Sequence, residues 1–218
     1  MPTYPHGPRI LKGAIVVINE TNPLPQTIAL QYNPETVTRS LQPQVGGGDQ
    51  GARSQVVRYI GAPVETIELE VYLDAVDALE QGDSTAIQAG IYPQLALLEL
   101  LVYPDSRQVL QNDALLAAGT LEIAPMVAPL ILFVWGPNRV LPVALTSLSI
   151  REELFDTNLN PIRATLTLNM RALSYSDLAP GTRGYNLFLA YQQAKESMAA
   201  QGPVASSSFT GVTSNRFS

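Results

Sequence analysis

Two segments of the chain alternate apolar and polar residues so regularly that each predicts a strand with one buried face. They span residues 64–73 and 162–173. The apolar positions are Ile67, Leu69, Val71 and Leu73 in the first segment, and Ile162, Ala164, Leu166, Leu168 and Met170 in the second. A period of two is typical of a sheet that packs one face on a core and exposes the other to water.

Further β-rich segments, separated by turn signals, predict the rest of the sheet. They are residues 13–20, 27–32, 129–135, 139–145 and 147–155, with a short strand expected at 119–123. Turns are expected at residues 21–26, at Asn33-Pro34, at Gly136-Pro137 and at residues 156–161. Consecutive strands joined by short turns indicate antiparallel hairpins.

Two segments predict helices. Residues 93–102 carry Pro93 in the first turn and a stripe of Leu95, Leu98, Leu101 and Val102, and Tyr103-Pro104 ends them. Residues 185–200 carry a stripe of Leu187, Tyr191, Ala194 and Met198. The expected fold is mainly β (α+β): an antiparallel β-barrel or sandwich with one flanking helix and a C-terminal helical extension.

The expected organisation is an N-terminal arm (1–11), a β-barrel domain (12–178) and a C-terminal extension (179–218). The extension comprises a linker (179–184), the helix 185–200 and a Ser/Gly-rich tail. Inside the domain, residues 41–54 contain Gly46, Gly47, Gly48 and Gly51 and predict a long flexible loop.

The composition of the chain narrows the classes of function that it can have. Charged residues are only 15% of the chain, below the roughly 25% usual for soluble proteins, so partners are expected to cover part of the surface. A net charge of −6 argues against nucleic-acid binding. Apolar runs stop well short of about 18 residues, so we expect no insertion into a membrane. No signal peptide is seen in residues 1–9, so we expect the protein to be made and assembled in the cytoplasm.

Acidic residues gather in one stretch without an intervening Lys or Arg. They are Glu65, Glu68, Glu70, Asp74, Asp77, Glu80 and Asp83. Such a run is usually a solvated face; the alternative is an acidic strip that faces a charged partner or a lumen.

Catalytic groups are scarce. The chain has no cysteine and a single histidine, His6, which excludes thiolate chemistry, Cys-ligated zinc and histidine triads. Gly46–Gly48 are followed by Asp49 and Gln50 instead of the Lys-Ser/Thr of a phosphate-binding loop. The carboxylate pairs Glu68/Glu70 and Glu152/Glu153 lie on regular strands, and Trp135 is expected to anchor the core. We therefore predict no catalytic, cofactor-binding or metal-binding residues, no cofactor and no enzymatic activity.

Four segments, in order, resemble the tube-protein domain of extracellular contractile injection systems, which are phage-tail-like particles. Residues 30–37 (LQYNPETV) resemble an early strand ending in Asn-Pro, and residues 64–74 an acidic alternating strand. Residues 129–136 (PLILFVWG) resemble the P-x-x-x-F-x-W-G strand, and residues 145–168 a late hairpin whose return strand opens with Arg-Ala.

The resemblance implies a structural subunit that forms a hexameric tube-initiator or adaptor ring between the spike-baseplate hub and the inner tube. Implied partners are further copies in a homo-hexamer, the spike or hub protein, the inner tube protein, and baseplate or sheath subunits. Relatives often carry a C-terminal LysM module; residues 179–218 are too short for one, which makes helix 185–200 a candidate replacement. We expect the 41–54 loop and this helix to lie at subunit interfaces.

Two alternatives stay open. One is another baseplate or phage-tail component, since barrel architecture is shared among them. The other is a wall- or carbohydrate-binding β-module, which would need an exposed aromatic patch drawn from nine scattered tyrosines.

Overall fold

The structure, a computed structural model, describes residues 11–18, 26–46, 58–119 and 128–202. The strands in these ranges are β1 (Ala14–Ile18), β2 (Gln26–Ala29), β3 (Val37–Gln42), β4 (Val45–Gly46), β5 (Arg58–Tyr59), β6 (Val64–Asp74), β7 (Leu130–Val134), β8 (Val140–Phe155) and β9 (Pro161–Ala172). The helices are α1 (Val76–Glu80), α2 (Ser84–Ala89), α3 (Tyr92–Glu99), α4 (Ser106–Ala117) and α5 (Arg183–Ala200).

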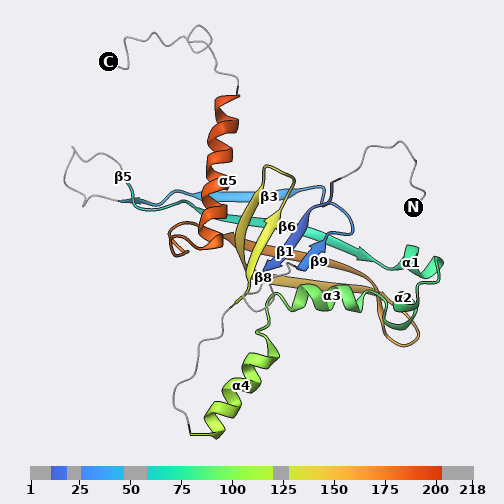
Figure 1. Ribbon diagram of the computed structural model, residues 1–218. Coiled ribbons are helices and arrows are strands. Elements are labelled where there is room, and N and C mark those ends of the chain that lie inside the picture. Colours follow the sequence, from blue (N-terminus) through green and yellow to red (C-terminus); the bar gives the residue numbers. More distant parts are fainter. Residues whose placement is uncertain (1–10, 19–25, 47–57, 120–127, 203–218) are drawn as a thin grey trace, which may run out of the picture.

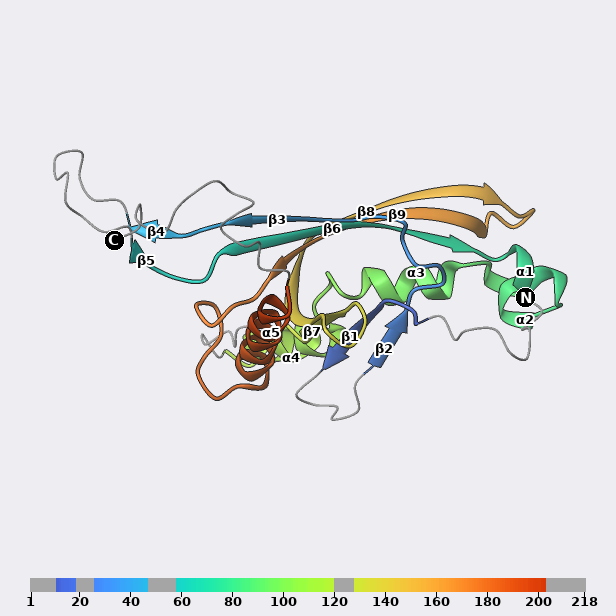
Figure 2. The same cartoon turned by 90° about the horizontal axis from the view of Figure 1, so that it is seen from above.

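Seven strands form one antiparallel sheet in the order β2-β1-β7-β8-β9-β6-β3, and β4 pairs with β5 separately. The long strands β3, β6, β9 and β8 form an extended layer, while β7, β1 and β2 lie on one side of it at an angle (Figure 2). Helices α3 and α5 lie on that same side, so the four long strands keep one face covered and one face open (Figure 2). The fold is therefore mainly β with a C-terminal helix, as the sequence predicted.

The core forms where the apolar faces of β6 and β9 meet the strands and helices packed beneath them. Its fully buried side chains include Phe133, Leu166, Leu168, Met170 and Leu95. Trp135 packs against this core and its ring stacks on that of Phe133 at a centroid distance of 5.9 Å. Trp135 is thus the core anchor that its place in the sequence indicated.

The predicted alternation holds in both marker strands. In β6, Ile67, Leu69, Val71 and Leu73 are all buried. In β9, Ala164, Leu166, Leu168 and Met170 are buried as predicted, whereas Ile162 is only partly buried. The two strands pair directly, with Leu69 opposite Leu168. The hairpin expected from residues 13–32 also forms, since β1 pairs with β2 with Ile15 opposite Ile28.

Several boundaries and elements differ from the expectation. Residues 139–145 and 147–155 belong to the single strand β8, because a bulge between Leu145 and Ser147 shifts the register without breaking the strand. Part of the loop expected over 41–54 is strand: Leu41 and Gln42 belong to β3, and Val45 and Gly46 form β4, which pairs with β5.

More helix is present than the single flanking helix of the prediction. Asp83 and Asp105 accept hydrogen bonds from backbone amides at the starts of α2 and α4, which is how Asp caps a helix. α3 ends at Glu99, so Val102 is exposed and not part of its apolar stripe.

The C-terminal helix starts at Arg183, inside the predicted linker, because Thr182 caps it. Its buried residues are Gly184, Phe188 and Tyr191, whereas Met198, expected in the stripe, is exposed. The N-terminal arm up to residue 10, the turn 21–25, most of the 41–54 loop, the strand expected at 120–123, the tail from residue 203 and His6 lie outside the described residues.

Candidate functional site

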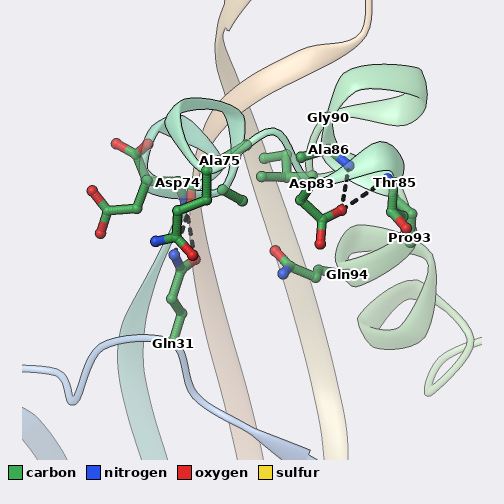
Figure 3. A pocket seen from close by; sticks show the side chains of 13 residues that line it. Gln31, Asp74, Ala75, Asp83, Thr85, Ala86, Gly90, Pro93 and Gln94 are labelled. Atoms are coloured by element: carbon green, nitrogen blue, oxygen red, sulfur yellow. Dashed lines mark hydrogen bonds between the residues drawn. The ribbon is translucent and has the colours of Figure 1, made fainter. Parts of the chain in front are cut away.

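One cleft of the described chain lies where the end of β6 meets α1, α2 and α3 (Figure 3). It measures about 330 Å³, and Asp74, Asp77 and Asp83 are among its lining residues. Asp83 accepts hydrogen bonds from Thr85 N and Ala86 N at 2.8 and 3.0 Å, and Asp74 forms an ion pair with Arg163 at 2.8 Å. These carboxylates hold helices and strands together.

Gln31 closes the other side of this cleft. Its amide nitrogen donates to the carbonyl of Asp74 at 2.7 Å, and its amide oxygen accepts from Asp74 N at 2.9 Å (Figure 3). This two-way bond ties the segment after β2 to the end of β6. Across the described residues no group of three or more His, Asp or Glu side chains could hold a metal ion. The cleft is therefore best understood as a structural joint.

One carboxylate of the predicted acidic run is buried. Glu65 is 3% exposed, and its Oε1 accepts from Arg39 Nε at 2.8 Å and also from Arg39 Nη2. Lys195 Nζ lies 3.3 Å from Glu65 Oε2, and the Tyr191 hydroxyl accepts from Arg39 Nη2 at 2.9 Å. A buried charge is tolerated when it is paired and hydrogen-bonded in this way. The Glu65 cluster (Arg39, Glu65, Tyr191 and Lys195) thus fastens α5 to the edge strand β3.

The acidic run is consequently divided among three places, so it forms neither a single solvated face nor the alternative, one continuous strip. Glu65 is buried beneath the sheet, and Glu68 and Glu70 lie on its open face. The remaining acids, from Asp74 to Asp83, lie at the end of the molecule that carries α1 and α2 (Figure 1).

The open face of the long strands is polar. Its side chains alternate with the buried ones and are mostly hydroxyls, with acids and arginines in balance: Thr38, Ser40, Thr66, Glu68, Glu70, Tyr72, Ser147, Ser149, Arg151, Glu153, Arg163, Thr165, Thr167, Asn169 and Arg171. Tyr72 is the one large side chain with an apolar body among them, and a hydrogen bond to Glu70 raises the pKa of its hydroxyl. Such a face is suited to water rather than to a dry contact.

Two strand edges of this layer are open within the described chain. β3 is the last strand of the sheet and pairs only with β6. β7 pairs with β8 only between Val140 and Val143, which leaves the far half of β8 without a partner on that side. Unpaired edges are templates for a strand of another chain.

Three further surfaces expose apolar side chains. On α4 no residue is buried, and the helix stands away from the rest of the molecule (Figure 1). At the opposite end of the sheet from β4 and β5, the β8–β9 turn exposes Leu154, Phe155 and Leu159. At the β4–β5 end itself, Tyr59 and Ile60 are exposed. Open strand edges and exposed apolar ends are features of a structural subunit that packs against other chains.

Comparison with known proteins gives the family. The family model described as "Contractile injection system tube protein" matches residues 14–178. The chain therefore belongs to the contractile injection system tube protein family, a family of structural components of phage-tail-like particles. Among curated proteins, none matches the chain.

Similar solved structures include a chain of the anti-feeding prophage (AFP) baseplate, determined by cryo-EM and 6-fold symmetrised. It is 14% identical, with 77% of this chain and 93% of that chain covered, at a TM-score of 0.26. The family assignment rests on the sequence match and not on this likeness. No helix in the described ranges has both the length and the apolar character needed to cross a membrane.

Sequence reasoning missed the Glu65 cluster, although the signal was present. Residue 65 has the same parity as Ile67 and Leu69, so alternation places it on the buried face. A buried Glu requires a cationic partner, but nothing in the sequence pattern says that Arg39 and Lys195 are the partners. The turn between β8 and β9 falls within the predicted residues 156–161, but the sequence analysis did not single out the exposed Leu159 in the turn or the exposed Leu154 near the end of β8.

Proposed function

We propose that this protein forms a closed ring of six copies that acts as the tube-initiating or adaptor layer, between the spike-baseplate hub and the inner tube. The observation that carries this proposal is the pair of open edges, β3 on one side of the long-stranded layer and the far half of β8 on the other. The strands of the layer are antiparallel throughout, so β3 of one copy and β8 of the next would also run antiparallel. Repeating this contact adds four strands per copy.

Simple geometry supports a hollow ring. Six copies give a sheet of about 24 strands, spaced about 4.8 Å apart and tilted by about 40° in a barrel. The backbone circle is then roughly 50 Å across, which leaves an open channel after side chains are added. The hydroxyl-rich open face would line this channel, and the apolar face would stay under β7, β1, β2 and the helices.

The C-terminal helix supports the same contact. Figure 1 shows α5 crossing in front of β3 and continuing past the edge of the sheet, and Figure 2 shows that it lies on the covered side of the long strands. The part that remains in contact ends near Lys195, and the residues from Glu196 to Ala200 are all exposed. In the proposed ring this overhang would lie beneath β8 of the next copy, so helix 185–200 would contribute to the interface. Residues 12–178 would then form the ring domain, and residues 179–218 the strap that joins copies.

Hydrogen exchange tests the ring directly. In a strand at an open edge, alternate amides point to water and exchange rapidly. We expect fast exchange at alternate positions of β3 and of residues 148–155 in the isolated chain, and strong protection at the same positions in purified particles. The pairing is refuted if these amides exchange equally fast in both states.

The alternatives have less support. A different baseplate or phage-tail component would share the fold, and its position in the particle would distinguish it. A carbohydrate-binding module would need aromatic side chains on one surface. The exposed tyrosines of the described chain are instead spread over separate elements: Tyr59 on β5, Tyr72 on β6 and Tyr92 on α3, with Tyr32, Tyr103 and Tyr175 in connecting segments.

A further inference from the structure

The β8–β9 turn is built as a rigid end. Asp156 Oδ1 accepts from Asn158 N and Asn160 N, both at 2.7 Å, and Asn160 Nδ2 donates to Asp156 Oδ2 at 2.8 Å. The hydrogen bond from the Asn160 side chain lowers the pKa of Asp156. The turn has a fixed shape as a result.

The same turn is attached to the helices beside it. Asn160 Nδ2 donates to the carbonyl of Gln88 at 3.0 Å, and Ile91 N donates to the carbonyl of Pro161 at 2.9 Å. The backbones approach so closely at Gly90 that an added Cβ would lie 2.1 Å from the Pro161 carbonyl oxygen. The turn and the α2–α3 junction therefore form one block.

On this rigid block, two leucines adopt a backbone conformation that disfavours them. Leu154 has φ of 55° and Leu159 has φ of 64°, in the left-handed region that glycine and asparagine adopt more easily. Their side chains are 55% and 79% exposed, so neither gains much by packing inside the chain. Phe155 between them is 50% exposed. For folding alone, glycine or asparagine would serve better at 154 and 159. Strained residues on a well-fixed scaffold are a mark of functional sites.

The surroundings are acidic. Asp77 and Glu80 on α1 and Glu152 on β8 have no ion-pair partner among the described residues, whereas Asp74 and Glu153 pair with Arg163 and Arg151. α1 and α2 lie beside the end of β8 and β9 (Figure 2). This end therefore carries exposed apolar side chains together with uncompensated negative charge.

We propose that the hairpin-end surface (Leu154, Phe155 and Leu159 with Asp77, Glu80 and Glu152) docks onto a different protein of the particle. Its binding surface would be an apolar recess rimmed by Lys and Arg side chains, because that chemistry complements both features. The strands run toward this end, so the contact is axial and separate from the lateral contact between β3 and β8. The inference rests on the proposed ring, since it assigns one face of that ring to the neighbouring layer.

The decisive variant is the double substitution Leu154→Gly and Leu159→Gly. It removes the exposed side chains and relieves the backbone at the same time, so the melting temperature of the purified chain should be unchanged or higher. The number of complete particles per cell, counted by electron microscopy, should fall at least tenfold. The double substitution Leu154→Asn and Leu159→Asn should give the same two results as the double glycine variant. Thr157→Ala, which removes an exposed side chain from the same turn, serves as the matched control and should assemble normally.

A photo-crosslinking amino acid at position 159 identifies the partner. In purified wild-type particles we expect a cross-link to another component, at a segment with Lys or Arg within a few residues. Three results would overturn the inference. They are a cross-link only to a second copy of this chain, normal assembly of the double glycine variant, and a lowered melting temperature of that variant. If the wild-type chain forms no ring in the particle, the proposed function is wrong, whatever the hairpin-end surface does. If the double glycine variant still forms rings but those rings do not join the next layer, the proposed ring holds and the loss is in the axial contact.

Discussion

Replacing Glu65 by leucine should release the C-terminal helix from the sheet. Glu65 is 3% exposed, and its carboxylate binds Arg39 on β3 and Lys195 on α5. Leucine fills a similar volume but leaves both cations without their partner. The helix would then keep its buried contacts through Gly184, Phe188 and Tyr191 but lose the ionic link to the sheet through Glu65.

The expected loss follows from how far the abandoned charges can reach water. Removing one partner of a fully buried ion pair costs about 3–5 kcal/mol. The Arg39 and Lys195 side chains are 24% and 42% exposed, so both can be partly rehydrated. We therefore expect the free energy of unfolding to fall by about 2–3 kcal/mol.

Two measurements separate this account from general damage. Denaturant unfolding gives the total loss, and hydrogen exchange shows whether α5 opens before the rest of the chain. Adding Arg39→Leu to Glu65→Leu removes the orphaned cation on β3 and should recover about 1 kcal/mol. Glu196→Gln, at an exposed position one residue beyond Lys195, is the control and should change stability by less than about 0.5 kcal/mol. A loss below about 0.5 kcal/mol for Glu65→Leu, with protection of α5 unchanged, would refute the reasoning.

Two further predictions concern the end of the molecule that carries α1 and α2. Gly90→Ala should lower the free energy of unfolding by more than about 2 kcal/mol, because the new Cβ meets the Pro161 carbonyl. Gly82→Ala is the control: Gly82 has a similar positive φ and nothing within 4 Å, so this change should cost only about 1 kcal/mol. Equal losses of the two variants in chemical denaturation would contradict the close approach at Gly90. The pKa of Asp156 is lowered in the folded chain, so the stability that its carboxylate contributes is present above the ordinary pKa near 3.8 and is lost as the pH falls through the lower folded value. Hydrogen exchange of the Asn158 and Asn160 amides should therefore accelerate below about pH 4, relative to an Asp156→Asn variant. A parallel pH response in the two proteins would rule this out.

The regular strands could be predicted from sequence because their alternation is set by local geometry. β6 and β9 bury one side and expose the other along their whole length, so the period of two is visible without knowing any partner. β3 was missed for the opposite reason. Its core-side residues are Val37, Arg39 and Leu41, and a charged residue in the middle hides the pattern.

The candidate surfaces depend on long-range placement, which a single sequence does not reveal. Arg39, Glu65 and Lys195 are far apart in the chain and meet only because α5 folds back beneath β3. The strain at Leu154 and Leu159 depends on a turn conformation that their neighbours impose. By contrast, Asp83 and Asp105 were readable as helix caps, and α2 and α4 could have been predicted from them.

In the proposed ring, β3 of each copy pairs with β8 of the next. The decisive measurement is a cryo-EM reconstruction of the purified particle, resolved well enough to trace strands. We expect one layer in which β3 of each copy lies beside β8 of the next, around an open channel lined by the hydroxyl-rich face. Copies placed outside any symmetric layer, or a layer in which both edges face solvent, would contradict it.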